Sequence, residues 1–120
     1  MTLAPITLFV YNRVDVLEKT VEALKANELA SESNLFIFAD GPKYLNDPKV
    51  KAVRDYIKTI NGFRQITIIE QEKNLGLANS IILGVTKIVN EYGKIIVVED
   101  DIVTSPYFLN FMNDALDMYE

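Results

Sequence analysis

The chain has 120 residues, with 12 basic and 17 acidic side chains and a formal net charge of −5. This length suits one domain, and the 49% share of hydrophobic residues indicates a globular fold. Because Cys and His are both missing, disulfides, zinc–thiolate sites, cysteine nucleophiles, imidazole ligands and Ser-His-Asp triads are excluded. The acidic balance argues against binding a nucleic-acid backbone, although a nucleotide can still be held through a divalent cation.

Nothing in the sequence predicts a membrane anchor. No segment approaches the roughly 20 apolar residues of a membrane-spanning helix. The apolar residues 1–11 have no basic flank and no cleavage site of small residues, so they do not fit a signal peptide. We therefore expect a soluble, cytoplasmic protein.

The first part of the chain predicts two strands around one helix. Residues 6–11 form a short apolar run with β-branched members, which predicts a buried strand. A helix is predicted to follow it and to end near Asn27, and a second buried strand is predicted at residues 35–39. The apolar positions with helical spacing are Leu17, Val21 and Leu24.

The middle of the chain opens on a strong helix start. Asp47 is placed to be the N-cap, and Pro48 then occupies the first helical position. The Asn-Gly pair at residues 61–62 is predicted to end this helix. A third strand is predicted at residues 66–69.

The last third of the chain continues the alternation. A third helix is predicted from Leu77 to Gly93, and the most hydrophobic strand follows at residues 95–98. Ser105 and Pro106 are predicted to open a last helix. Aromatic residues at helical spacing in that helix are expected to lie in the core: Phe108, Phe111 and Tyr119.

Apolar strands that alternate with helices predict an α/β domain with a mainly parallel sheet of four strands. In such sheets ligands bind beyond the carboxyl ends of the strands, near the point where the strand order reverses. Polar segments follow all four predicted strands, at residues 12–13, 40–41, 71–76 and 99–101. We therefore expect the chemistry of this chain at that edge of the sheet.

Three consecutive carboxylates, Glu99, Asp100 and Asp101, follow the fourth predicted strand. Their like charges repel, and a hard divalent cation such as Mg²⁺ or Mn²⁺ would relieve that repulsion. Neighbouring side chains of an extended chain point in opposite directions, so Asp100 and Asp101 are expected to differ in role. Taken alone, the triplet fits a solvated turn at least as well.

The other polar segments also have two interpretations. Asp40 could accept hydrogen bonds from a base or a sugar, but Asp before Gly-Pro is also an ordinary turn former. Arg13 suits a diphosphate or a base carbonyl, whereas Asn12 and Asp15 could equally cap the first helix. Residues 73–78 carry one Gly ahead of a helix start, a natural place for the polar groups of a ligand.

Four motifs occur together along the chain: Phe-Val-Tyr-Asn-Arg at residues 9–13, Phe-Ala-Asp-Gly-Pro-Lys at 38–43, Asn-Leu-Gly-Leu-Ala-Asn-Ser at 74–80 and Val-Val-Glu-Asp-Asp at 97–101. In this order they resemble the nucleotide-sugar-binding half of GT-A glycosyltransferases, in the family 2-like group and the N-acetylglucosaminyltransferase I type. The resemblance implies a partial, Rossmann-like GT-A nucleotide-diphospho-sugar transferase fold. Residues 1–120 would be a single donor subdomain, truncated at its C-terminus.

The resemblance also implies roles for individual residues. Asp101 would bind the Mn²⁺ or Mg²⁺ that bridges the diphosphate, Glu99 would support the metal shell, and Asp100 would face the ribose. Asp40 would hydrogen-bond the uracil of a UDP-sugar. The other residues implied to contact the donor are Tyr11, Asn12, Arg13, Asn74, Gly76 and Ala78.

The resemblance further implies a bacterial-type, inverting enzyme. This enzyme would transfer a sugar from a nucleotide-sugar donor to a saccharide or glycoconjugate acceptor. Its acceptor site and catalytic base would lie outside this chain, so the 120 residues alone are expected to be inactive. The strand at residues 95–98 would lack one neighbour, and an exposed apolar edge predicts self-association.

Two other classes of protein use a similar sheet and a metal. A sugar-phosphate nucleotidyltransferase would carry a Gly-rich loop after the first strand, whereas residues 11–15 contain no Gly. A phosphoacceptor receiver domain would place its acidic pair after the first strand and a lone Asp after the third. Here the acidic triplet follows the fourth strand and the third ends in Glu70. Both classes stay open as alternatives.

Overall fold

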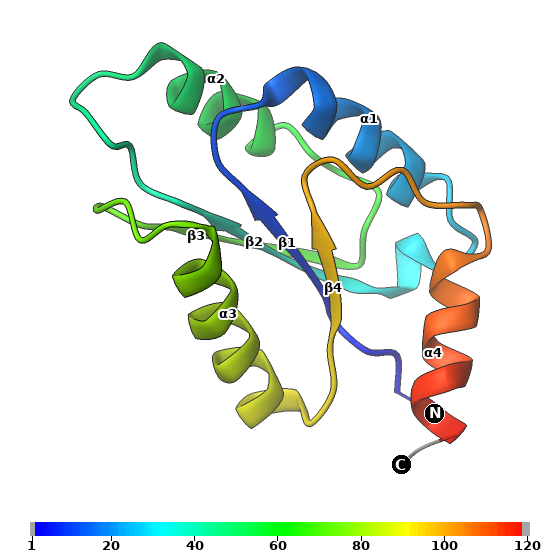
Figure 1. Cartoon of the computed structure of the whole chain (residues 1–120). Helices are drawn as coiled ribbons and strands as arrows, with labels where there is room; N and C mark the ends of the chain where they lie inside the picture. Colours follow the sequence, from blue (N-terminus) through cyan, green and yellow to red (C-terminus); the bar gives the residue numbers. More distant parts are fainter. Residues whose placement is uncertain (1, 119–120) are drawn as a thin grey trace.

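The computed structural model describes residues 2–118, and its four strands form one parallel sheet (Figure 1). The order across the sheet is β3-β2-β1-β4. The α/β class and the parallel sheet are therefore confirmed, and each predicted strand differs from the observed one by one residue at one or both ends. The strands are β1 (Ile6–Val10), β2 (Asn34–Ala39), β3 (Gln65–Glu70) and β4 (Ile96–Glu99).

Helices cover both faces of this sheet (Figure 1). Apolar residues of α1, α2 and α4 pack on one face, and α3 packs on the other. A short 3₁₀ helix, η1 (Ala30–Glu32), precedes β2 and was not predicted. The α-helices are α1 (Val14–Lys25), α2 (Pro48–Ile57), α3 (Leu77–Tyr92) and α4 (Phe108–Met118).

The larger core lies between the sheet and the three helices α1, α2 and α4. Alternate residues of β1 enter it, because successive side chains of a strand point to opposite faces. Burying one Leu or Ile side chain contributes roughly 1.5–3 kcal/mol. The apolar positions predicted for α1 are all buried, as is one residue of α4: Leu17, Val21, Leu24 and Leu109.

The smaller core lies on the opposite face, under α3. Phe9 and Phe38 stack there with ring centroids 5.4 Å apart, and Ile88 of α3 is fully buried beside them. Gly84 allows α3 to approach closely, since an added Cβ would lie only 2.7 Å from the Phe9 ring. This face therefore places an aromatic surface directly behind the carboxyl ends of β1 and β2.

Two predictions about the helices were wrong. Phe111 is 70% exposed rather than in the core. Because each helical residue advances about 100° around the axis, Phe111 lies far from the direction of Leu109, which is buried. The second helix ends at Ile57, before residues 61–62, because Thr59 N–H donates to the Tyr56 carbonyl three residues back. Tyr119 lies outside the described residues.

The outer edge of β4 is unpaired within residues 2–118, as predicted, because its partner in this sheet is β1 alone. Val97 of β4 is exposed on the face that carries α3. Over the same described range, none of the helices is long and apolar enough to cross a lipid bilayer.

Candidate functional site

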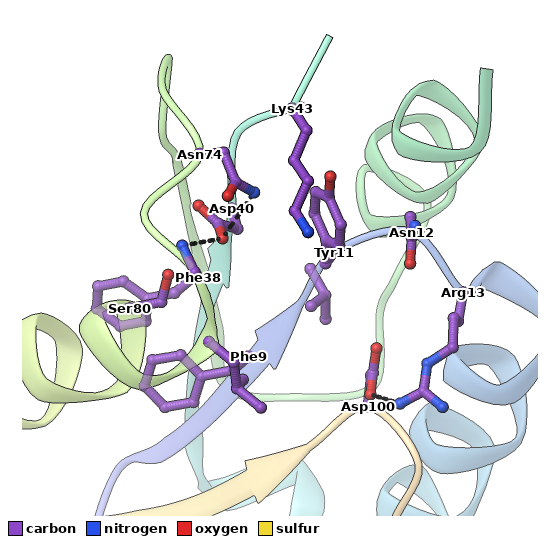
Figure 2. A pocket seen from close by; sticks show the side chains of 13 residues that line it. Phe9, Tyr11, Asn12, Arg13, Phe38, Asp40, Lys43, Asn74, Ser80 and Asp100 are labelled. Atoms are coloured by element: carbon purple, nitrogen blue, oxygen red, sulfur yellow. Dashed lines mark hydrogen bonds and ion pairs between the residues drawn. The ribbon is translucent and has the colours of Figure 1, made fainter. Parts of the chain in front are cut away.

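A cavity of about 270 Å³ opens at the carboxyl ends of β1, β2 and β4 (Figure 2). The strand order reverses at β1, which has β2 and β3 on one side and β4 on the other, and ligands of open α/β sheets bind at such a point. The cavity therefore lies where the polar segments were expected to meet. Its lining residues with polar side chains are Tyr11, Asn12, Arg13, Asp40, Lys43, Asn74, Ser80 and Asp100.

One end of the cavity is charged. Arg13 Nη2 donates to Asp100 Oδ1 at 2.8 Å and lies 3.5 Å from Asp101 Oδ2. The hydrogen bond to Asp100, together with the charge of that carboxylate, raises the pKa of Arg13 above its ordinary value. Asp100 is buried and Asp101 is exposed, but both lie in the turn after β4 and both reach Arg13, so the opposite directions expected of an extended chain are not observed and a difference in role stays a prediction.

The backbone below this ion pair is anchored to α1. Thr20, which is fully buried, donates its hydroxyl hydrogen to the Asp100 carbonyl at 2.8 Å. Among the described residues neither Asn12 nor Asp15 makes a capping hydrogen bond, because the N-cap position of α1 is Arg13. The side chain of Asn12 therefore lines the cavity without the capping role that was its alternative.

Two acidic side chains, Asp100 and Asp101, lie close enough together to share one cation with a bound ligand. Oxygens of Asp100 and Asp101 approach the same nitrogen of Arg13, so the two carboxylates can converge on one positive group. No group of three acidic side chains that could hold a metal occurs in residues 2–118. Mg²⁺ is commonly bound by one or two carboxylates together with phosphate oxygens and water. The donor set thus fits a cation that arrives with a diphosphate.

The opposite wall of the cavity is held by Asp40. Its Oδ1 accepts the backbone N–H groups of Gly41 and Leu75 at 2.8 and 2.9 Å. Its Oδ2 accepts Gly76 N–H at 3.0 Å and the Asn74 side-chain amide at 3.3 Å (Figure 2). Both oxygens of this buried carboxylate are therefore in use within the chain.

The segments after β2 and β3 are in direct contact at this wall. Asn74 Nδ2 also donates to the Gly41 carbonyl at 2.9 Å. An added Cβ on Gly41 would lie 2.4 Å from the carbonyl carbon of Lys73, a contact that real Cβ atoms do not make. Residues 40–43 and 73–76 together are called the Asp40 wall below.

Apolar and unpaired polar groups complete the cavity. Phe9, Phe38 and Leu77 form its apolar part. Lys43 extends into the cavity beside Tyr11 (Figure 2) and has no ion-pair partner in the described part of the chain. Ser80 lies on the first turns of α3, and its buried hydroxyl has no hydrogen-bond partner within residues 2–118.

The cavity brings together seven of the ten residues expected at the site: Tyr11, Asn12, Arg13, Asp40, Asn74, Gly76 and Asp100. Asp101 is joined to them through Arg13, whereas Ala78 and Glu99 do not line the cavity. Sequence reasoning missed Ser80 and the two Phe residues as lining residues. It placed Lys43 in a motif without giving it a role, and a basic residue after a strand end was the available signal.

Comparison with known families decides between the classes considered above. The model of Glycosyl transferase family 2 matches residues 6–117. The chain belongs to this family. Its membership removes the support for a receiver domain and for a nucleotidyltransferase, while the resemblance to the N-acetylglucosaminyltransferase I type stays a prediction. No curated protein sequence matches the chain.

Solved structures show the same fold at low sequence identity. S. aureus TarS matches over 98% of this chain with a TM-score of 0.68 and 12% identity. Its 1–349 fragment matches over 97% with a TM-score of 0.65 and 13% identity. The mannosyltransferase PcManGT from Pyrobaculum calidifontis, in complex with GDP-Man and Mn²⁺, matches over 93% with a TM-score of 0.64 and 12% identity. The chain spans 20%, 32% and 31% of these three structures.

Proposed function

We propose that this chain forms the donor-binding part of a glycosyltransferase that uses a UDP-sugar. In the proposed reaction the bond between the anomeric carbon and the diphosphate oxygen breaks, and an oxygen of a saccharide or glycoconjugate bonds to that carbon with inversion. The proton of the acceptor passes to a base that the proposal places outside these 120 residues. The cytoplasmic location stays a prediction.

The observation that carries the proposal is the cavity itself. The chain belongs to family 2, and its cavity lies at the point where the strand order reverses. One end of the cavity carries the ion pair of Arg13 and Asp100, and the other end has an aromatic surface. A diphosphate suits the charged end and a nucleobase suits the aromatic end. Tyr11, Asn12 and the Asp40 wall would then line the nucleotide between them, with Ala78 next to that wall.

Asp101 and Glu99 are the proposed metal ligands, with Asp100 beside them at the ribose. A bound Mn²⁺ or Mg²⁺ would neutralise the charge that develops on the leaving diphosphate. Support for Asp101 comes from its place beside the positive charge of Arg13, 3.5 Å from Nη2, and from PcManGT, whose structure holds GDP-Man and Mn²⁺. Arg13 would turn from the carboxylates toward the phosphates when the cation is present, because it carries the charge that the cation replaces.

The deciding experiment is a calorimetric titration of UDP, GDP and CDP into the chain, with and without Mn²⁺, repeated on Asp101→Asn. We expect UDP to bind only with Mn²⁺ and the variant to lose most of that dependence. Tighter binding of GDP than of UDP would support a donor site that recognises guanine instead of uracil. Absence of binding by all three nucleotides would contradict the proposal.

Self-association through the free edge of β4 is the second part of the proposal. Val97 is exposed on the face that carries α3, next to this edge, and the unpaired edge offers backbone groups to another strand. We expect the chain to dimerise in light scattering at high concentration and Val97→Lys to shift it toward the monomer. A wild-type chain that stays monomeric would contradict this part and leave the donor site unaffected.

A further inference from the structure

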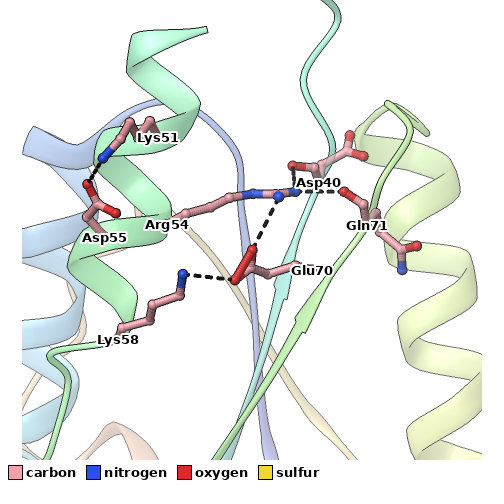
Figure 3. Close-up of polar contacts among 7 residues, drawn as sticks. All are labelled: Asp40, Lys51, Arg54, Asp55, Lys58, Glu70 and Gln71. Carbon is pink, nitrogen blue, oxygen red and sulfur yellow. Dashed lines mark hydrogen bonds and ion pairs between the residues drawn. The ribbon is translucent and has the colours of Figure 1, made fainter. Parts of the chain in front are cut away.

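Arg54 of α2 lies outside the cavity and ties together the ends of two strands behind it (Figure 3). Its Nη2 donates to the carbonyl of Gln71 at 2.6 Å and to the carbonyl of Asp40 at 3.3 Å. Its Nη1 lies 3.2 Å from Glu70 Oε2. One guanidinium therefore holds the last residue of β3 and the residues that directly follow β2 and β3.

Asp40 connects this contact to the cavity. Its carbonyl accepts from Arg54 on one side, and its carboxylate accepts the amides of Leu75 and Gly76 on the other. Arg54 thus holds the backbone of the Asp40 wall at the Asp40 carbonyl, and the Asp40 carboxylate holds the Leu75 and Gly76 amides. Since both carboxylate oxygens are used within the chain, the wall can form before any ligand arrives.

We propose that Arg54 is a positioning residue of the donor site, a proposal that rests on the function proposed above. The parallel ladder fixes the ends of β2 and β3, and Arg54 fixes the next residues, Asp40 and Gln71, in the arrangement in which Asp40 captures the Leu75 and Gly76 amides. A guanidinium is planar and presents several donors in a fixed geometry, so one Arg can serve two carbonyls and a carboxylate at once. A wall held in this way is organised in advance for the nucleotide, which reduces the entropy lost on binding.

The alternative is that Arg54 only stabilises the fold. The two roles differ in what they change. A residue that only stabilises would alter the free energy of unfolding and speed amide exchange throughout the chain. A positioning residue changes exchange locally, at Leu75 and Gly76, and changes nucleotide affinity in protein that remains folded.

The first test measures amide hydrogen exchange in Arg54→Lys, Arg54→Met and Lys51→Met, and it needs no nucleotide. Lys51 is the matched control, because it lies on the same helix and pairs with exposed Asp55 away from the wall. We expect exchange at Leu75 and Gly76 to be about tenfold faster in Arg54→Met and intermediate in Arg54→Lys. Exchange at Leu75 and Gly76 should be unchanged in Lys51→Met. In every variant it should also be unchanged at the Ile96 amide, which donates a hydrogen bond to the Pro5 carbonyl. Equal acceleration at Ile96 would overturn the proposal.

The second test measures UDP affinity with Mn²⁺ by calorimetry, at a temperature where every variant is folded. We expect about tenfold weaker binding for Arg54→Met, partial recovery in Arg54→Lys, and wild-type binding for Lys51→Met. In the double variant Arg54→Met, Asp40→Asn, the fold loss of UDP affinity should be smaller than the product of the two separate losses, since both residues hold one wall. Wild-type affinity in Arg54→Met, or independent losses, would overturn the proposal.

A wild-type chain that binds no nucleotide would instead contradict the proposed function. In that case the exchange rates at Leu75 and Gly76 would still decide whether Arg54 holds the wall.

Discussion

Arg13 and Asp100 join the ends of β1 and β4 through a 2.8 Å contact between Nη2 and Oδ1, across the point where the strand order reverses. Because Asp101 lies 3.5 Å from the same nitrogen, the guanidinium serves as the positive charge for two neighbouring carboxylates. A cation that binds these carboxylates must compete with Arg13.

This competition predicts that Arg13→Met binds Mn²⁺ more tightly than the wild type when no nucleotide is present. The side chain of Arg13 is 52% exposed, so the lost ion pair should lower the free energy of unfolding by less than about 1 kcal/mol. Titration of Mn²⁺ followed by electron paramagnetic resonance measures the affinity. Arg64→Met, a change at an exposed residue outside the cavity, is the control. Unchanged or weaker Mn²⁺ binding in Arg13→Met would show that Arg13 does not compete.

Gly41→Ala should disrupt the Asp40 wall. The new Cβ would lie 2.4 Å from the Lys73 carbonyl carbon, and because the clash is with backbone the segment must move. We expect the free energy of unfolding to fall by about 1–3 kcal/mol in urea denaturation, as for overpacked sites, and UDP binding to weaken. Gly76→Ala has open space around its Cβ, so its cost, about 1–3 kcal/mol, comes from backbone strain alone, because a φ of +82° with a ψ of 156° is a conformation that essentially only Gly adopts. A Gly41→Ala variant as stable as the wild type would refute the close contact.

Thr7→Val and Thr20→Val should change stability in opposite directions. Both Thr residues are fully buried, but the Thr7 hydroxyl has no partner within residues 2–118, whereas Thr20 donates to the Asp100 carbonyl. Removing an unpaired buried hydroxyl should stabilise the fold by about 1 kcal/mol, and removing a paired one should destabilise it by a similar amount. Thermal unfolding of the two variants measures the difference. A loss of stability in Thr7→Val would mean that its hydroxyl is paired.

Asp55 should titrate below the ordinary range of a carboxyl group. Its hydrogen bond with Lys51 lowers the pKa of Asp55, and the charges of Lys51 and Lys58 add to this. A depressed folded-state pKa stabilises the fold above the unfolded value of about 3.9 and loses that effect as the pH falls through the folded value. NMR titration of the side-chain carboxyl carbon should therefore show a low midpoint that Lys51→Met returns toward normal. Equal midpoints in the two proteins would argue against this contact in solution.

The fold was largely predictable because its signals are local. Apolar runs place the strands, and Asp47 with Pro48 begins α2 at the predicted residue, with Asp47 Oδ1 accepting Lys49 N–H at 2.9 Å. The edge of the sheet that carries the site followed from parallel pairing alone. Phe111 was misplaced because a helical stripe defines an apolar face without fixing which of its members point into the core.

The site was predictable by position and less so by contact. Arg13 with Asp100 and Asp40 with Asn74 were placed at one edge, and they do meet there. The Leu75 and Gly76 amides that bind Asp40 could not be predicted, because backbone donors leave no mark in a sequence. Arg54 was missed for a related reason, because its partners are mainly backbone carbonyl groups. It also reaches them from α2, outside the cavity.

The central place of β1 has a consequence for synthesis of the protein. Ile6 pairs with Leu35 on one side and with Ile96 on the other, so its second neighbour is synthesised long after its first. Until then the nascent chain carries β1 with one bare edge, and contacts between residues so far apart in sequence form slowly. The strand that leads into Tyr11, Asn12 and Arg13 therefore gains its second neighbour only with β4, and the cavity, which Asp100 lines, can form only after the acidic triplet has been synthesised.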